Sequence, residues 1–131
     1  MSLLERLEIK HPIFLAPMAG VSTPALAAEV SNQGGLGSLG LGASSISAAR
    51  AQILATQALT DAPFQVNFFC HRSEKLDPEI TAQWLNYLAP QFEHFNEPVP
   101  EKLECIYPSF LDHDDFLNLV LETRPKAVSF H

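Results

Sequence analysis

Cysteine, basic residues and long apolar runs are all scarce in this 131-residue sequence. The two cysteines, Cys70 and Cys105, form no CxxC pair and are too few for a disulfide framework, which favours a reduced, cytoplasmic location. Lysine and arginine number 8 against 15 aspartates and glutamates, and the net charge of −7 argues against binding to nucleic acid or to an anionic membrane. No apolar run has the length of a membrane-spanning helix, and the N-terminus lacks the apolar core of a signal peptide.

Apolar residues make up 47% of the sequence, which is enough for one modest domain with a buried core. Residues 13–16 (IFLA) are expected to form a strand buried on both faces, because no polar residue alternates with the apolar ones. Further strands are expected at 36–41, where small residues indicate a crowded position, at 64–69 (FQVNFF) and at 127–130 (AVSF).

Polar caps predict where the intervening helices begin. Thr23 and Asp77 are each followed by proline, the favoured residue at the first helical position. Two further helices are expected to begin near Ser44 or Ser45 and at Asp112.

Glycine and proline predict where the same helices end. The stops are Gly34, Pro90 and Pro125. Between caps and stops, apolar residues recur at helical spacing and are expected to form the buried faces. These residues are Leu26, Ala27 and Val30; Ile46, Ala49, Ile53 and Leu54; Ile80, Trp84, Tyr87 and Leu88; and Phe116, Leu117, Val120 and Leu121.

Alternating strands and helices imply an α/β fold with parallel strands joined by right-handed crossovers. The irregular, proline-containing stretch from about 91 to 108 is interpreted as an insertion of the kind that forms lids or decorates ligand sites. A TIM (β/α)₈ barrel needs about 250 residues, and the last strand here has no helix after it. We therefore expect residues 1–131 to be a single partial domain, comprising the first four βα units and forming the N-terminal half of such a barrel.

The turn Pro17-Met18-Ala19-Gly20 follows the first predicted strand, at the end of a parallel strand where α/β folds bind ligands. Proline fixes the exit from the strand, and the small residues leave the backbone open to a flat ring. Met18 offers that ring a polarisable surface. The alternative is an ordinary strand-to-helix turn with Met18 in the core.

Polar residues in or just after the later strands are further candidates. Asn67 lies in an otherwise apolar strand, where an unpaired amide would cost about 1–3 kcal/mol, so it needs a ligand or neighbouring backbone as a partner. His131 would face the mouth of the barrel and position an anionic substrate, unless as the terminal residue it is disordered. His71 ends the third strand in the same layer. No metal site is expected, because no acidic, histidine and cysteine set has ligand spacing and His113 belongs to a helix cap.

The segment APMAGVSTPALAAEVSNQGGLGSLG resembles the nitronate monooxygenase (2-nitropropane dioxygenase) family, and the similarity continues through FQVNFFCH and RPKAVSFH. The resemblance implies an FMN-dependent TIM-barrel flavoprotein, an oxidoreductase that converts alkyl nitronates and O2 to a carbonyl compound and nitrite. It implies that Pro17, Met18 and Ala19 line the isoalloxazine ring with backbone atoms, and that Asn67 hydrogen-bonds FMN.

The family's catalytic histidine belongs to a QGxEAGGH-like motif, and its phosphate-binding glycines come later still. Both are absent from this sequence. The resemblance therefore places the catalytic residue beyond residue 131, leaves the FMN site incomplete and implies that the fragment alone is inactive.

Two other functions agree with the same residues. One is an FMN-dependent enoyl-acyl-carrier-protein reductase, whose opening motifs are similar. The other is a non-catalytic half-barrel without flavin, which self-associates or pairs with the missing barrel half because it has two open sheet edges and an exposed interior.

Overall fold

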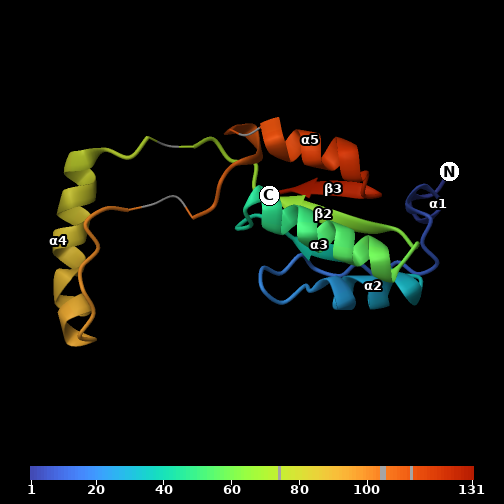
Figure 1. Cartoon of the computed structure of the whole chain (residues 1–131), viewed down its shortest axis with the longest axis horizontal. Coiled ribbons are helices and arrows are strands. Elements are labelled where there is room, and N and C mark those ends of the chain that lie inside the picture. Colours follow the sequence, from blue (N-terminus) through green and yellow to red (C-terminus); the bar gives the residue numbers. More distant parts are fainter. Residues whose placement is uncertain (74, 104–105, 113) are drawn as a thin grey trace. The chain divides into compact units, whose positions relative to one another are not determined.

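A computed structural model describes residues 1–73, 75–103, 106–112 and 114–131. Cys105 and His113 lie outside the described residues. The chain forms two compact units: Met1–Arg72 together with Tyr107–His131, and Ser73–Ile106 (Figure 1). No helix of the described residues is long and apolar enough to cross a membrane.

The larger unit is built on a three-stranded parallel sheet with the order β1-β2-β3. Its strands are β1 (Gly37–Gly40), β2 (Phe64–Phe68) and β3 (Ala127–Phe130), which confirms three of the predicted strands to within a residue or so.

The first predicted strand differs from expectation. Residues 13–16 make a single parallel bridge, from Phe14 to Leu36. Ile13 is 61% exposed and Phe14 is 45% exposed, so the prediction of burial on both faces is wrong. The reason is that Leu15 alone of this segment packs against the core, which lies on one side of the sheet.

Five helical segments accompany this sheet, and their caps follow the predicted chemistry. Thr23 accepts a hydrogen bond from Leu26 N–H, and Ser45 accepts one from Ala48 N–H. Gly34, with φ +89°, ends the second helix as expected. The segments are α1 (Leu3–Leu7), α2 (Pro24–Asn32), α3 (Ile46–Leu59), η1 (Phe110–Asp112) and α5 (Asp114–Thr123). Asp112, predicted to cap the last of them, is instead the final residue of η1.

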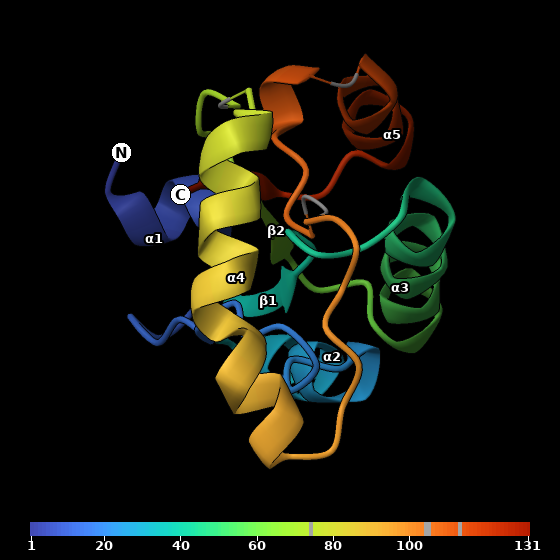
Figure 2. The ribbon, with the colours of Figure 1, turned by 90° about the vertical axis from the view of Figure 1, so that its left-hand side faces the viewer.

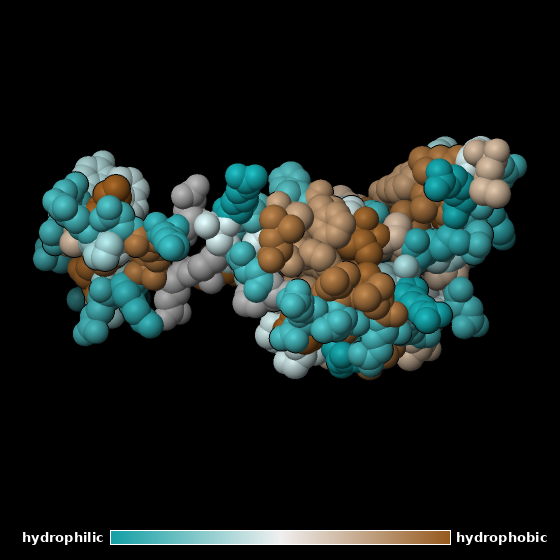
Figure 3. All heavy atoms as spheres, turned by 90° about the horizontal axis from the view of Figure 1, so that it is seen from above, coloured by the Kyte–Doolittle hydropathy of each residue, from teal (hydrophilic) through white to brown (hydrophobic). Residues whose placement is uncertain are grey.

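Helices α2, α3 and α5 are ranged on one side of the sheet (Figure 2), where they bury a single core. That core consists of Ala27, Leu39, Leu41, Ala49, Ile53, Phe64, Val66, Phe68, Phe116 and Leu119. The predicted helix faces are partly wrong, because the larger residues Leu26, Leu54, Leu117 and Leu121 are exposed. The small residues Ala27, Ala28 and Ser31 on α2 and Ala49 on α3 are buried instead. Apolar patches remain on the surface of the α5 side of this unit (Figure 3).

The two faces of the sheet differ in chemistry because side chains alternate along a strand. Two rows of partner residues run across the three strands on the same face. One row is Gly40, Asn67 and Ser129, and the other is Ser38, Gln65 and Ala127. None of these six residues belongs to the core. The face away from α2, α3 and α5 is therefore polar or small.

An ion pair joins two of the covering helices. Arg50 on α3 contacts Glu122 on α5 through two nitrogen–oxygen pairs, at 2.6 and 2.8 Å. The hydrogen bonds and charge of Arg50 lower the pKa of the Glu122 carboxyl below its ordinary value.

The smaller unit contains α4 (Pro78–His94), which Asp77 caps as predicted. The prediction that Pro90 ends this helix is wrong, since Pro90 lies inside it. Pro90 is exposed, so water can reach the carbonyl group that proline leaves without a partner. Trp84 and Tyr87 were expected to be buried, but they stack on each other with ring centroids 5.3 Å apart and are 52% and 65% exposed.

Candidate functional site

A hollow of about 250 Å³ lies past the carboxyl ends of the strands in the larger unit. It brings together four of the residues singled out from the sequence: Pro17, Ala19, Asn67 and His131. The remaining lining residues are Gly40, Gly42 and Phe69. Segments far apart in sequence thus meet at the end of the sheet where parallel α/β folds bind ligands.

The turn on one side of this hollow is held by Ser22, a residue that the sequence patterns did not single out. Ser22 is 4% exposed. Its Oγ accepts a hydrogen bond from Met18 N–H at 2.9 Å and donates one to the carbonyl oxygen of Ala16, also at 2.9 Å. The Met18 carbonyl in turn accepts bonds from Val21 and Ser22 N–H. This network fixes the backbone of the turn.

Gly40 lets the end of β1 pass close beneath the same turn. A Cβ atom at Gly40 would lie 3.0 Å from both Ala19 N and Met18 C. The expectation that small side chains are required in this stretch is therefore confirmed. A neighbouring hollow of about 290 Å³ shares Ala19 and Gly40 and opens toward the cap of α2 at Thr23.

Asn67 has protein partners on the adjacent strand. Its Nδ2 donates to Ser129 Oγ at 2.9 Å and to the Ser129 carbonyl oxygen at 3.2 Å. The amide nitrogen is thus satisfied by β3, the neighbouring-strand alternative considered from the sequence. Asn67 still lines the hollow, with its amide held at one wall.

His131 continues the strand ladder beyond β3. Its N–H donates to the Phe68 carbonyl at 3.1 Å, and its carbonyl accepts a bond from Cys70 N–H at 2.9 Å. The imidazole packs edge-on against Phe69, with ring centroids 6.2 Å apart. Main-chain bonds and a ring contact therefore hold His131 at the hollow.

Two sequence candidates do not line the hollow. Met18 is 37% exposed and does not line the hollow, and its N–H and carbonyl take part in the hydrogen bonds within the turn. His71 is exposed, and its carbonyl accepts a bond from Ser109 Oγ at 2.6 Å. Sequence reasoning also did not identify Gly42 and Phe69 as lining residues, although Gly42 directly follows one predicted strand and Phe69 ends another.

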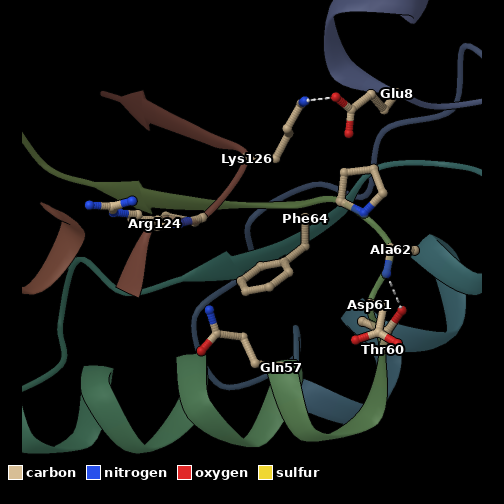
Figure 4. A pocket seen from close by; sticks show the side chains of 10 residues that line it. Glu8, Gln57, Thr60, Asp61, Ala62, Phe64, Arg124 and Lys126 are labelled. Atoms are coloured by element: carbon tan, nitrogen blue, oxygen red, sulfur yellow. Dashed lines mark hydrogen bonds and ion pairs between the residues drawn. The ribbon is translucent and has the colours of Figure 1, made fainter. Parts of the chain in front are cut away.

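A larger hollow, of about 420 Å³, lies at the amino ends of β2 and β3 (Figure 4). Several of its polar groups are paired with other groups of the chain: Lys126 Nζ is 2.5 Å from Glu8 Oε1, and Gln57 donates to the Thr123 carbonyl at 2.7 Å. The amino-end face of parallel α/β barrels generally carries stability rather than catalysis. We therefore place the candidate site at the carboxyl ends.

These features define a class of protein: parallel α/β chains of the barrel type, with a ligand hollow formed by the turns that follow their strands. The family model described as nitronate monooxygenase matches residues 1–131, the whole chain. The chain belongs to the nitronate monooxygenase family.

Two relatives share just over half of the aligned residues with this chain. The chain is 54% identical over 130 residues to the nitronate monooxygenase of Paraburkholderia phytofirmans, and 52% identical over 125 residues to that of Pseudomonas aeruginosa. These alignments cover 99% and 95% of this chain but 36% of each relative. The chain thus spans about a third of the length of the relatives it matches.

Solved structures agree with the fold. The nitroalkane oxidase from Streptomyces ansochromogenes superimposes with a TM-score of 0.78 at 32% identity, covering 99% of this chain and 36% of that one. FabK from Thermotoga maritima gives a TM-score of 0.61 at 29% identity, covering 98% and 29%. The chain has the α/β fold of the N-terminal part of a TIM barrel, as expected from the sequence.

Proposed function

We propose that this chain forms the N-terminal wall of an FMN site, in a protein that oxidises alkyl nitronates with O2 to a carbonyl compound and nitrite. The observation that carries the proposal is the meeting of Pro17, Ala19, Asn67 and His131 at one hollow, in a chain that matches the nitronate monooxygenase family throughout. We further propose that residues 1–131 are the first four βα units of one partial domain, with an insertion at about 91–108, and that the protein works in the cytoplasm.

The hollow fits one edge of a flat ring rather than a whole cofactor. Its volume of about 250 Å³ is below the roughly 300–1,000 Å³ of complete small-molecule sites. Pro17 and Ala19 form one wall, and Asn67 offers an amide. Gly40 and Gly42 have no side chains to fill the hollow at the end of β1. No lysine or arginine lines it among the described residues, so the phosphate of FMN needs groups from elsewhere.

In this arrangement the chain binds and orients, and bound FMN supplies the electron-transfer and oxygen chemistry that side chains lack. Pro17 and Ala19 would hold the ring plane, and Asn67 would hydrogen-bond its edge. His131 would place an N–H toward a nitronate oxygen, which carries negative charge. Phe69 supports the His131 ring and keeps that wall of the hollow apolar.

The proposal is tested first by FMN binding to the 131-residue chain. Titration followed by quenching of flavin fluorescence is expected to show weak, saturable binding that Gly40→Ala reduces, because the new Cβ would press on the turn. Gln57→Ala is the matched control, since Gln57 lines the hollow at the opposite end of the strands. Equal binding by both variants would count against the site.

Activity is tested in a chimera that carries this chain in place of the matching third of the Pseudomonas aeruginosa relative. We expect nitrite to form from an alkyl nitronate with the chimera, and none with the 131-residue chain alone. A second candidate function, FMN-dependent enoyl reduction, is supported by the likeness to FabK. Reduction of an enoyl thioester by NAD(P)H without nitrite production would favour that candidate and reject the first.

We also propose that the isolated chain self-associates, or pairs with the rest of a barrel. The support is that β3 has one strand neighbour among the described strands, and that Ile13 and Phe14 are exposed beside β1. Sedimentation showing a monodisperse monomer that unfolds cooperatively would refute this part of the proposal.

A further inference from the structure

The orientation of the Asn67 side chain is fixed by its contacts with β3. Both bonds to Ser129, at 2.9 Å to Oγ and 3.2 Å to the carbonyl oxygen, are donated by Nδ2. A backbone carbonyl can only accept hydrogen bonds, so the amide group facing it must be the NH2. Turning the amide over would set Asn67 Oδ1 against the Ser129 carbonyl, two acceptors facing each other.

The Asn67 Nδ2 group has two hydrogens, and Ser129 offers two acceptors, its Oγ and its carbonyl oxygen, so Nδ2 has no hydrogen left for a ligand. Asn67 Oδ1, in contrast, takes part in no hydrogen bond given by the described part of the chain. Because Asn67 lines the hollow, the atom it can offer to a ligand is an acceptor. A ligand group that meets it must therefore be an N–H or O–H donor.

Ser129 is placed for this role by the register of the sheet. It lies directly opposite Asn67 in the parallel pairing of β2 and β3, so the two side chains project from the same face. The Ser129 hydroxyl supplies the second acceptor for Nδ2, beside the Ser129 carbonyl oxygen. Without the Oγ, one amide hydrogen loses its partner and the amide is freer to rotate.

We propose that Ser129 is a positioning residue that locks Asn67 as a hydrogen-bond acceptor for the imide N–H of the flavin ring. This inference rests on the proposed function. The pyrimidine part of an oxidised flavin has one ring N–H, the imide N3–H between two carbonyl groups, and its other ring-edge heteroatoms accept. A locked acceptor therefore recognises that edge in one orientation, whereas a rotating amide would not.

The positioning step is tested without flavin, by nuclear magnetic resonance of the ¹⁵N-labelled chain. In the wild type the two Asn67 side-chain amide protons are expected to exchange slowly with water. Ser129→Ala should speed their exchange by roughly 2- to 10-fold, the factor that corresponds to one net hydrogen bond, and Ser129→Thr should restore it. Unchanged exchange in Ser129→Ala would overturn the positioning role.

Recognition of the imide is tested by comparing FMN with N3-methyl-FMN, in which the donor is removed. The wild type is expected to bind FMN roughly tenfold more tightly, because N3-methylation leaves a buried acceptor unpaired. In Ser129→Ala this ratio should fall toward one, and in Ser129→Thr it should be kept. A wild-type ratio of one, or an undiminished ratio in Ser129→Ala, would overturn the proposal.

Ser109→Ala is the matched structural control. Ser109 is fully buried and its Oγ donates to the His71 carbonyl, but it does not line the hollow. This variant should lower stability while leaving both the Asn67 exchange rates and the FMN preference unchanged. If the chain binds neither flavin while Asn67 exchange still depends on Ser129, the proposed function and the imide assignment fail together and the positioning role stands.

Discussion

Two buried serines with different hydrogen bonding provide a direct test of what shapes the candidate site. Ser22 and Ser38 are 4% and 0% exposed. Ser22 Oγ bonds to Met18 N–H and to the Ala16 carbonyl, both at 2.9 Å, whereas Ser38 Oγ is the buried side-chain atom without a partner among the described residues. Replacing either serine by alanine removes one oxygen atom from a buried place.

The expected effects are opposite. Ser22→Ala loses two hydrogen bonds at a net value of about 0.5–1.5 kcal/mol each, so it should destabilise the chain by about 1–3 kcal/mol. At roughly 4 °C per kcal/mol for a chain of this length, the thermal midpoint should fall by about 4–12 °C. Ser38→Ala removes a buried hydroxyl that has no partner, so it should leave stability unchanged or raise it by up to about 1 kcal/mol.

Urea unfolding followed by circular dichroism measures both variants against the wild type, and an unchanged dependence on urea concentration checks that the unfolding reaction is the same. FMN titration on the same samples asks whether the turn has lost its shape, which we expect for Ser22→Ala alone. The reasoning is refuted if the two alanine variants lower the midpoint equally, or if Ser22→Ala binds FMN as the wild type does.

Further predictions concern the ion pair and two glycines, Gly20 in the turn and Gly40 at the end of β1. Because Arg50 lowers the pKa of Glu122, the pair stabilises the fold above the ordinary carboxyl pKa of 4.5 and loses this effect as the pH falls through the lower folded-state pKa. Glu122→Gln should therefore be less stable than the wild type at pH 7, with a difference that shrinks in acid and in 1 M salt, as urea midpoints would show. A difference that is constant with pH would contradict this assignment. Gly20→Ala should cost about 1–2 kcal/mol, because Gly20 has φ +73° with open space around it, and should spare flavin binding. Gly40→Ala should cost about 1–3 kcal/mol through its contact with Ala19 and Met18, and should weaken flavin binding as well.

Local signals in the sequence predicted much of the fold correctly. Thr23, Ser45 and Asp77 act as caps because a cap is a contact between residues two or three positions apart, which the sequence displays directly. Strand β3 was likewise predicted to the residue, since a short segment containing Val128 and Phe130 follows a proline break.

Features that depend on distant packing were predicted less well. On α5, Phe116 is buried as predicted, but Leu117 and Leu121 are exposed. Leu119, which was not predicted, is buried in the core instead. Periodicity gives the width of an apolar stripe but not which part of it meets the neighbouring element. Pro90 is similar, because its effect on α4 depends on whether water can reach the carbonyl group it leaves unpaired.

The residues of the candidate site also differ in whether local sequence signals could identify them. Pro17, Ala19 and His131 could be selected because they come after predicted strands, and parallel strands end on one edge. Asn67 could be selected because it is an amide within an otherwise apolar strand. Ser22 and Ser129 could not, since the bond of Ser22 depends on how the turn folds back and that of Ser129 joins residues 62 positions apart. Their roles follow from the register of the sheet and the shape of one turn.

Because side chains alternate between the two faces of the sheet, the strand register that buries the core also places the residues of the site. A slip of one residue in the pairing of β3 against β2 would carry Ser129 beneath the helices and turn Val128 to the other face, while Asn67 and Val66 kept their places. Such a chain would lose its stability together with its ligand contacts.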